Sequence, residues 1–432
     1  MPRYNVTVSC PIHDSFRVQQ VAGMFDVPLS SKSTEQFHVD LPTDRDDWQI
    51  GLIVGPSGSG KSTVARHAFG DELYESADWP TDRAVVDAFG DLPVRNVVEL
   101  FTAVGFGSPP SWIKPYHVLS NGERFRCDLA RALGKVESRE LSVESPKSLN
   151  SQPSTLNPLI AFDEFTSVVD RTVAKVCSAA IAKGIRNGNL PCRFVAVTCH
   201  YDVAEWLEPD WVLDMATQEL RVRPLEDKER SGFGVQGSGA LPELRTLNPE
   251  PWFSRPPIEL QIHRCRVATW EMFKRHHYLS GSLPPGCRCY LTTWNDTPVN
   301  FCATLPVIAK RNHRRFTRIV TLPDYQGLGI GMRSVAAVAE LHRAEGHRIN
   351  VTSSHPALIR HCVRSPLWKA VNVKKSGTRP ASSQRFPNYH NSAGRAVVSF
   401  EFVGTERGPA QGTPHAHRGS NEQSLHGCQS RR

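Results

Sequence analysis

Two patterns of hydrophobic residues alternate through the first half of the chain and predict a mixed α/β protein. Continuous apolar runs that end in polar residues are typical of strands buried on both faces of a parallel sheet. Apolar residues three or four positions apart predict helices between these strands. The expected strands are Trp48–Val54, Arg83–Phe89, Leu159–Glu164 and Arg193–His200, and the expected helices are Val64–Phe69, Val94–Val104 and Arg124–Leu133.

A different order of elements begins at about Pro257. Alternation and turn residues predict strands and a hairpin around Asn295-Asp296, followed by a strand, a long helix, a strand and a helix. The expected strands are Ile258–His263, Cys289–Trp294, Pro298–Thr304, Phe316–Leu322 and Ile349–Ser353, and the expected helices are Thr269–His276, Met332–Glu345 and Pro356–Val363.

This change of pattern divides the chain into two expected domains. The first spans residues 1–225, with short antiparallel strands before Trp48 and a Ser-, Pro- and Asn-rich insertion at 136–158 that we expect to be disordered. A Gly-rich stretch at 226–256 is typical of a linker. The second domain spans 257–403, and the polar residues 404–432 are typical of a disordered tail.

The composition of the chain indicates where the protein is located and leaves the division into two domains unchanged. The chain has 432 residues, of which 39% are hydrophobic and 22% charged, and no apolar run is long enough for a membrane span. Residues 1–5 lack the apolar core of a signal peptide, and the 11 cysteines do not form a disulfide or zinc pattern. We therefore expect a cytoplasmic protein; its net charge of +8 permits contact with nucleic acid.

The most specific motif follows the strand Trp48–Val54. Its nine residues fit the phosphate-binding P-loop, in which glycines let successive backbone N–H groups converge on phosphate oxygens. Lys61 is expected to reach the β- and γ-phosphates of ATP, and Ser62 to hold Mg²⁺. A flexible Gly/Ser loop is the alternative, but it does not explain the strand before and the helix after the motif. The motif consists of Gly55, Pro56, Ser57, Gly58, Ser59, Gly60, Lys61, Ser62 and Thr63.

Four further positions are weak signals alone. Asp163 and Glu164 end an apolar strand, where an aspartate can bind Mg²⁺ and the next glutamate can polarise the attacking water. His200 also ends a strand, although such a histidine is more often structural. The stretch Leu119–Glu123 can be an ordinary turn before a helix, and Asp170 follows soon after Glu164.

In this order, the motifs resemble those of the ATP-binding cassette (ABC) ATPases. The resemblance implies that Ser120 and Gly122 contact the γ-phosphate of ATP bound to a second subunit, and that Asp170 lies at the subunit contact. It implies that Glu164 is the general base or positions the attacking water, and that His200 senses and holds the γ-phosphate. It also implies an ATP-dependent, head-to-tail homodimer. The chain departs from the family in having no glutamine between Lys61 and Ser120. Either Asp87 or Asp91 takes the place of that residue, or its contact is missing.

A second glycine-rich turn lies between the strand Phe316–Leu322 and the helix at 332–345. Its spacing, with the strand before it and the helix after it, resembles the pyrophosphate-binding loop of GNAT acetyltransferases. The alternative is a glycine-rich helix start without a ligand. The resemblance implies that the backbone at 328–331 binds the pyrophosphate of acetyl-CoA. The implied acetyl-CoA residues are Leu322, Gln326, Gly327, Leu328, Gly329, Ile330 and Gly331.

The sequence does not identify the residue that contacts the 3′-phosphate of CoA or the catalytic base of this second site. The basic stretch 310–315 could meet the 3′-phosphate of CoA, but a solvated basic loop is the plainer interpretation. The strand 316–322 has no glutamate to serve as a base. His276, His277, Tyr278 and His355 are candidates, and each is more simply explained as structural.

Over residues 15–403 the chain resembles bacterial and mobile-element proteins that fuse an ABC-type ATPase to a predicted GNAT acetyltransferase. The fold class expected is therefore α/β, a P-loop NTPase domain followed by a GNAT-like α+β domain with a mixed sheet. The implied function is ATP hydrolysis coupled to acyl transfer from acetyl-CoA to an unknown acceptor. The main alternative is an ATP-gated switch, similar to SMC proteins, that binds nucleic acid or protein and uses the second domain for docking. A transporter subunit is a third possibility and would need a membrane partner.

Overall fold

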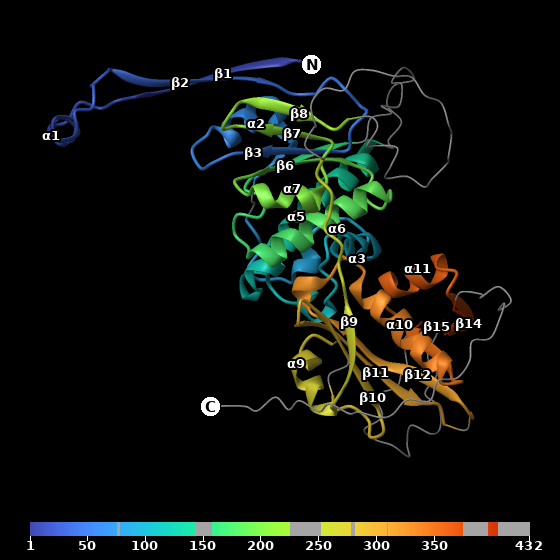
Figure 1. Cartoon of the computed structure of the whole chain (residues 1–432). Coiled ribbons are helices and arrows are strands. Elements are labelled where there is room, and N and C mark those ends of the chain that lie inside the picture. Colours follow the sequence, from blue (N-terminus) through green and yellow to red (C-terminus); the bar gives the residue numbers. More distant parts are fainter. Residues whose placement is uncertain are drawn as a thin grey trace, which may run out of the picture.

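Two β-sheets organise the chain (Figure 1). The computed structural model describes residues 1–75, 78–143, 158–224, 252–277, 281–308, 310–374 and 396–404, with only the backbone described for 136–143. We call residues 1–224 the N-terminal half and residues 252–404 the C-terminal half. Both halves mix helices and strands, as the hydrophobic pattern predicts.

The six-stranded sheet of the N-terminal half has the order β4-β5-β6-β3-β7-β8. All neighbouring strands are parallel except β7 and β8. The central strand β3 is buried along its whole length, which explains its continuous apolar sequence. The strands are β3 (Ile50–Val54), β4 (Leu73–Tyr74), β5 (Leu159–Phe162), β6 (Arg193–Thr198), β7 (Trp211–Asp214) and β8 (Glu219–Val222).

Helices pack on this sheet through two apolar clusters. One cluster contains Phe37, Val64 and Trp211, and the other contains Phe101, Phe125 and Ile181. The helices are α2 (Lys61–Phe69), α3 (Val94–Ala103), α4 (Pro109–Trp112), α5 (Asn121–Val143), α6 (Arg171–Arg186) and α7 (Ala204–Leu207). Because β5, β6 and β3 are parallel neighbours, their carboxyl ends meet at one edge of the sheet, where ligands bind in folds of this type.

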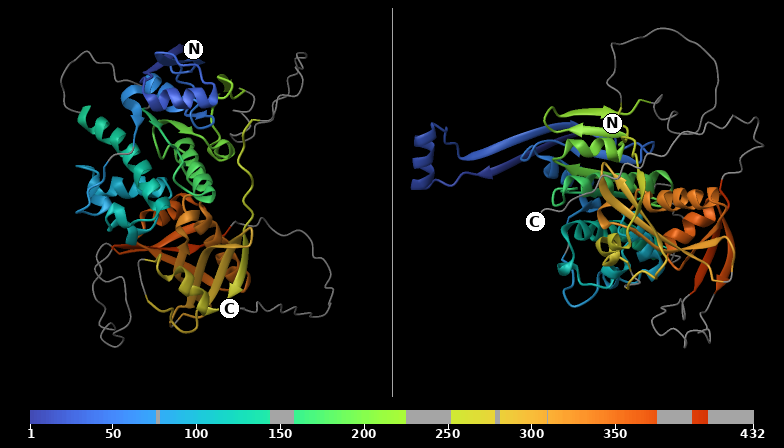
Figure 2. Two further views of the ribbon diagram at one scale, coloured as in Figure 1. Left: turned by 90° about the vertical axis from the view of Figure 1, so that its left-hand side faces the viewer. Right: turned by 60° about the horizontal axis from the view of Figure 1, so that its bottom comes forward.

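An antiparallel hairpin projects from this body (Figures 1 and 2). Strands β1 (Arg3–Pro11) and β2 (Lys32–Asp40) pair along their length, which confirms the antiparallel strands expected before Trp48. The sequence analysis did not predict the helix α1 (Phe16–Phe25) at the tip. Phe16, Met24 and Phe25 on this helix are exposed.

The C-terminal half is built on a mixed seven-stranded sheet with the order β14-β15-β13-β12-β11-β10-β9. The strands are β9 (Gln261–Cys265), β10 (Arg288–Trp294), β11 (Thr297–Pro306), β12 (His313–Thr321), β13 (Arg348–Ser353), β14 (Trp368–Lys374) and β15 (Val397–Phe402). Its helices are α9 (Trp270–Lys274), α10 (Ile330–Ala344) and α11 (Pro356–Arg364). Asn295 and Asp296 both have positive φ, as a tight two-residue hairpin requires, so the turn predicted there is confirmed.

The seven-stranded sheet splits between its neighbouring strands β12 and β13. β12 and β13 are parallel, but they pair only between His313–Arg315 and Arg348–Asn350. Beyond these residues β13 continues to pair with β15, and β12 with β11. The carboxyl-terminal parts of β12 and β13 therefore diverge, and this leaves backbone and side chains of both strands facing a cavity described below.

The structure corrects two local expectations. Residues 83–89 do not form a strand; Val85–Ala88 is a single 3₁₀ turn. Val85 in this turn and Phe89 just after it are both buried in the helical part of the core. The insertion at 136–158 is also not disordered throughout, because α5 continues to Val143; residues 144–157 lie outside the described residues.

The two halves are in direct contact. Val176, Ala179 and Trp206 of the N-terminal half form one buried cluster with Val299, Leu328 and Ile330 of the C-terminal half. Arg360 also forms an ion pair with Glu99 at 2.5 Å. Most of the expected linker, and the tail from 405 onward, lie outside the described residues. The end of that linker is not free, since Trp252 donates a hydrogen bond to the carbonyl of Pro209 at 2.8 Å.

Candidate functional site

The P-loop forms a sharp turn between β3 and α2. Gly58 and Gly60 have φ values of 81° and 84°, in the region that favours glycine. A Cβ on Gly60 would lie 2.4 Å from the ring of Phe37, so no larger residue fits there. This contact and the burial of Phe37 give that ring a packing role beneath the loop.

The polar groups of this turn fit a polyphosphate. No hydrogen bond is made within the described residues by the backbone N–H groups of Gly58, Gly60 or Lys61. The buried hydroxyl of Ser59 likewise has no partner there. The Lys61 ammonium donates to the carbonyl of Pro56 at 2.7 Å, which holds the cation beside the loop. The residues present are therefore those that an ATP phosphate chain needs.

Ser62 and Asp163 meet at the expected metal position. The Ser62 hydroxyl donates to Oδ1 of Asp163 at 3.0 Å, and the backbone N–H of Glu164 donates to the same oxygen at 2.9 Å. A hydroxyl and a carboxylate oxygen are ligands that Mg²⁺ accepts together with nucleotide phosphates. Within the described residues there is no group of three or more acidic, histidine or cysteine side chains that could hold a metal alone. The pair thus fits Mg²⁺ delivered with a nucleotide.

Glu164 and His200 lie at the ends of the adjacent strands β5 and β6. Glu164 and Thr166 have positive φ values of 53° and 69°, so the turn after β5 has an uncommon shape for non-glycine residues. The Thr166 hydroxyl and the His200 Nδ1 are 3.3 Å apart. Partial burial, assisted by Arg171, lowers the pKa of His200. The fold therefore brings the P-loop, Asp163, Glu164 and His200 to one sheet edge.

Ser120, Gly122 and Asp170 have local structural roles in this chain. Ser120 and Glu123 form a capping box at the start of α5, with the Ser120 N–H and hydroxyl both 3.0 Å from Oε2 of Glu123. The Gly122 carbonyl accepts from Arg126 at 3.1 Å, and Asp170 caps α6 by accepting from the N–H groups of Thr172 and Val173. None of the three contacts the P-loop of the same chain in the described residues. Their expected role towards a second subunit stays a prediction.

Asp87 and Asp91, considered as replacements for the missing glutamine, are both exposed. The described residues show no hydrogen bond or ion pair between either aspartate and the P-loop, Asp163 or Glu164.

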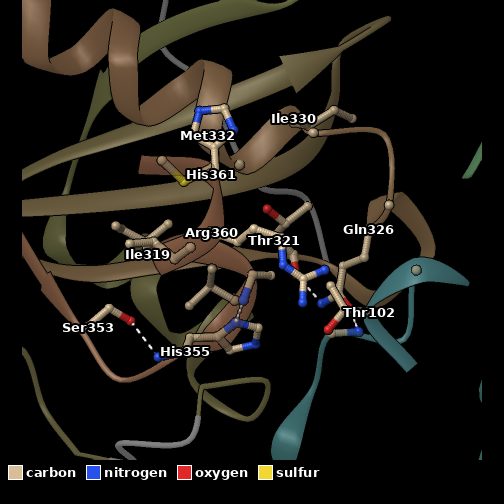
Figure 3. Close-up of a pocket in the computed structure, with 18 of the residues that line it drawn as sticks. Thr102, Ile319, Thr321, Gln326, Ile330, Met332, Ser353, His355, Arg360 and His361 are labelled. Carbon is tan, nitrogen blue, oxygen red and sulfur yellow. Dashed lines mark hydrogen bonds between the residues drawn. The ribbon is translucent and has the colours of Figure 1, made fainter. Parts of the chain in front are cut away.

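A cavity of about 510 Å³ lies where β12 and β13 diverge, and both halves of the chain line it (Figure 3). The C-terminal half contributes β12, the end of β13, α11 and the loop from Gln326 to Gly331. The N-terminal half contributes the end of α3, the turn at Gly105–Gly107 and the last turns of α6. A cavity of this volume is in the range that holds small-molecule ligands and cofactors.

The glycine-rich loop of the C-terminal half is packed against the N-terminal half. The Gly107 N–H donates to Oε1 of Gln326 at 2.6 Å, and the Gln326 amide nitrogen donates to the Thr321 carbonyl at 2.9 Å. A Cβ on Gly327 would lie 2.6 Å from the Cβ of Ala180 on α6. The loop therefore takes its shape partly from the other half of the chain.

The residues expected to bind acetyl-CoA do not all face the cavity. Gln326, Gly327, Gly329, Ile330 and Gly331 line it. Leu328 is buried in the cluster between the halves, but its N–H and that of Gly329 make no hydrogen bond in the described residues. Leu322 packs against the core, and its N–H donates to the Val299 carbonyl at 2.9 Å.

The stretch 310–315 lies at the wrong end of β12 for the predicted phosphate contact. Residue 313 begins this strand and residue 321 ends it beside the glycine-rich loop, so the two are roughly 27 Å apart at strand spacing. The solvated-loop interpretation holds for residues 310–312, which are exposed, but not for His313 and Arg314, which are buried at the start of β12.

The candidate acid–base histidines differ in their surroundings. His355 Nδ1 accepts from the Ala357 N–H at 3.3 Å, and this ring also hydrogen-bonds the backbone of Gly107, so it serves mainly as a bridge. His277 is buried against Trp270. His276 lines the cavity and accepts at Nε2 from Arg275 at 3.0 Å, so the neutral ring holds its lone pair on Nε2 and its proton on Nδ1. Burial, assisted by Arg275, lowers its pKa. Tyr278 lies outside the described residues.

Sequence reasoning missed the basic side chains that surround the cavity. Lys183 on α6 and His361 and Arg364 on α11 all line it. Their positions in the sequence give no signal, because nothing in the pattern of α6 indicates that its last turn meets a loop from the other half.

Comparison with known proteins finds similarity to solved structures at low sequence identity. No protein-family model matches the chain, and no curated protein matches it. The ribosomal-protein-S18-alanine N-acetyltransferase from Escherichia coli is 14% identical over 35% of this chain and 97% of its own, with a TM-score of 0.27. A GNAT family acetyltransferase from Elizabethkingia anophelis is 11% identical over 34% of this chain and 98% of its own, with a TM-score of 0.26. A dimeric bacterial ABC transporter cassette is 16% identical over 42% of this chain and 87% of its own, with a TM-score of 0.30.

The solved structures that match the chain thus include both ABC ATPase cassettes and GNAT acetyltransferases, each over one part of it. The fold class is mixed α/β, with a mostly parallel six-stranded sheet in the N-terminal half and a mixed seven-stranded sheet in the C-terminal half. The loops and strand order described above carry the functional argument that follows. No helix in the described ranges is long and apolar enough to cross a membrane.

Proposed function

We propose that the protein is an ATP-hydrolysing ABC-type ATPase whose C-terminal half transfers an acyl group from acetyl-CoA to an amine. The observation that carries this proposal is the cavity that both halves line, with a glycine-rich loop between β12 and α10 at its edge. The P-loop, Asp163, Glu164 and His200 supply the groups that ATP hydrolysis needs. We place both reactions in a cytoplasmic homodimer that assembles on ATP.

In the acyl-transfer step, the amine nitrogen forms a bond with the thioester carbonyl carbon, and the carbon–sulfur bond breaks. The amine loses one proton, and the departing thiolate gains one to become the thiol of CoA. His276 is the residue that we assign to accept the proton of the amine, because it lines the cavity and its Nε2 holds the lone pair of the neutral ring. The amine would take the place of the Arg275 contact at Nε2. A neutral imidazole can accept that proton at pH 7.

The two ligands are tested separately by calorimetric titration with acetyl-CoA and with Mg-ATP. Binding of both, followed by acetyl-CoA-dependent acetylation of an amine library, supports the proposal. Binding of Mg-ATP alone would remove the acyltransferase part and favour a switch that binds nucleic acid or protein. Salt-dependent binding of DNA would then support that alternative.

We predict that Gly329→Val weakens acetyl-CoA binding by at least about 10-fold and leaves Mg-ATP binding unchanged. Gly329 has a φ of 86°, which a β-branched residue resists, so the loop must change shape and misplace its N–H groups. Gly346→Val is the matched control, since Gly346 has a φ of 81° beyond the other end of α10 and no atom within 4 Å of an added Cβ. Equal losses in both variants would indicate general strain rather than a binding loop.

The pH dependence of acyl transfer should report His276. Since the pKa of His276 is lowered from its usual value of about 6.5, the imidazole is neutral at pH 7. The rate should therefore be full at neutral pH and fall as the pH drops through the lowered pKa. His276→Gln should remove this acidic limb and slow transfer by roughly 100-fold or more. A variant that keeps both the rate and the acidic limb would exclude His276 as the base.

A further inference from the structure

We propose that Lys183, a residue of the ATPase half, binds the phosphates of acetyl-CoA held by the C-terminal half. This inference rests on the proposed acyl-CoA site and adds a residue to it from outside the acyltransferase fold. The acyl-CoA site is then complete only when the two halves are docked.

The position of Lys183 carries the argument. It lies in the last turn of α6, and its ammonium is 3.5 Å from the carbonyl of Gly327 and 3.1 Å from the point where a Cβ on Gly329 would stand. The free N–H groups of Leu328 and Gly329 belong to the same loop. An anion bound by these N–H groups would therefore also have the Lys183 ammonium beside it.

The charges around Lys183 favour an anion. Desolvation lowers the pKa of Lys183, and the neighbouring cations Arg333 and Arg255 lower it further. Within the described residues none of these three cations forms an ion pair with a carboxylate. Cations gathered without acidic partners repel one another, and a bound phosphate would relieve that repulsion.

The cavity supplies the space for the rest of the ligand. Lys183, Gly329 and His361 line it together with the diverging strands β12 and β13. The phosphates of the ligand would lie at the loop and Lys183, while the thioester arm would run between the strands. A simple structural role for Lys183 is less well supported, since its one described hydrogen bond is long.

The test compares acetyl-CoA with acetylpantetheine, which carries the thioester arm but no phosphate. Calorimetric titration of Lys183→Ala in the full chain should show acetyl-CoA binding weakened by about 10- to 100-fold. Acetylpantetheine binding should stay the same as in the wild type. Lys183→Arg should recover part of the loss, and acetyl-CoA binding to the wild type should depend more steeply on salt than binding to Lys183→Ala.

Lys175→Ala is the matched control, because Lys175 lies on the same helix but is paired with Asp202 at 3.7 Å. It should bind acetyl-CoA as the wild type does. If the wild type binds acetyl-CoA and Lys183→Ala binds it equally well, this inference is wrong and the proposed function stands. An equal loss for acetyl-CoA and acetylpantetheine would show that Lys183 only holds the halves together. Failure of the wild type to bind acetyl-CoA would overturn both proposals.

Discussion

Glu164→Gln should lower the rate of ATP hydrolysis by at least about 100-fold while Mg-ATP still binds. The Glu164 carboxylate follows β5 at the same sheet edge as Asp163 and the P-loop. In the described residues it makes no hydrogen bond or ion pair, so it is available to polarise a water molecule. A glutamine has the same shape but is a far weaker base. Steady-state release of phosphate measures the change.

The same variant tests the predicted dimer. If hydrolysis separates two ATP-bound subunits, Glu164→Gln should accumulate as a dimer in the presence of Mg-ATP, visible as a doubled mass by light scattering. Glu208→Gln is a suitable control, since Glu208 also has a positive φ, of 50°, in the same half of the chain. Normal turnover in Glu164→Gln, or an equal loss in Glu208→Gln, would remove the role assigned to Glu164.

Lys61→Ala should weaken Mg-ATP binding by about 10- to 100-fold, the range expected when a charged hydrogen-bond donor to phosphate is removed. The only hydrogen bond described for the Lys61 ammonium is to the Pro56 carbonyl, so the fold should tolerate the change. Calorimetric titration with Mg-ATP measures the affinity, and circular dichroism checks the fold.

Lys32→Ala removes the same charge from the exposed edge of the hairpin arm and should leave Mg-ATP affinity unchanged. Wild-type affinity in Lys61→Ala would exclude the P-loop assignment. Retained acetyl-CoA binding in Lys61→Ala would show that the second site does not depend on bound nucleotide.

Local sequence signals predicted the elements whose shape depends on nearby residues. The P-loop lies between a buried strand and a helix, as its glycines and flanking pattern indicate. The pair Asn295-Asp296 forms the predicted hairpin turn because both residues accept positive φ. The same holds for α10 and β13, whose hydrophobic periods are clear.

The sequence analysis failed mainly for segments whose conformation depends on contacts between distant parts of the chain. Val85 and Phe89 have side chains that favour strands, but they are buried among helices, and the backbone at Val85–Ala88 is a 3₁₀ turn. The capping box of Ser120 and Glu123 is different, since the spacing Ser-x-x-Glu is a local signal for it that the sequence analysis did not use. The cavity could not be predicted, since Gly105, Ala180 and Lys183 meet Gln326 and Gly327 only through the docking of distant segments.

The described structure gives little support to the SMC-like alternative. Such a protein would need long coiled-coil arms, whereas α5 extends over 23 residues and is the longest helix of the described residues.

The course of α6 has a thermodynamic consequence. This helix begins at the Asp170 cap, where the resemblance to ABC ATPases places the subunit contact, and it ends with Lys183 at the acyl-CoA loop. Its 16 residues span roughly 24 Å. If a subunit contact formed on ATP moves α6, the coupling must run in both directions. If Mg-ATP changes the dissociation constant of acetyl-CoA by some factor, acetyl-CoA must change the dissociation constant of Mg-ATP by the same factor. The concentration of acetyl-CoA would then determine how readily two subunits associate on ATP.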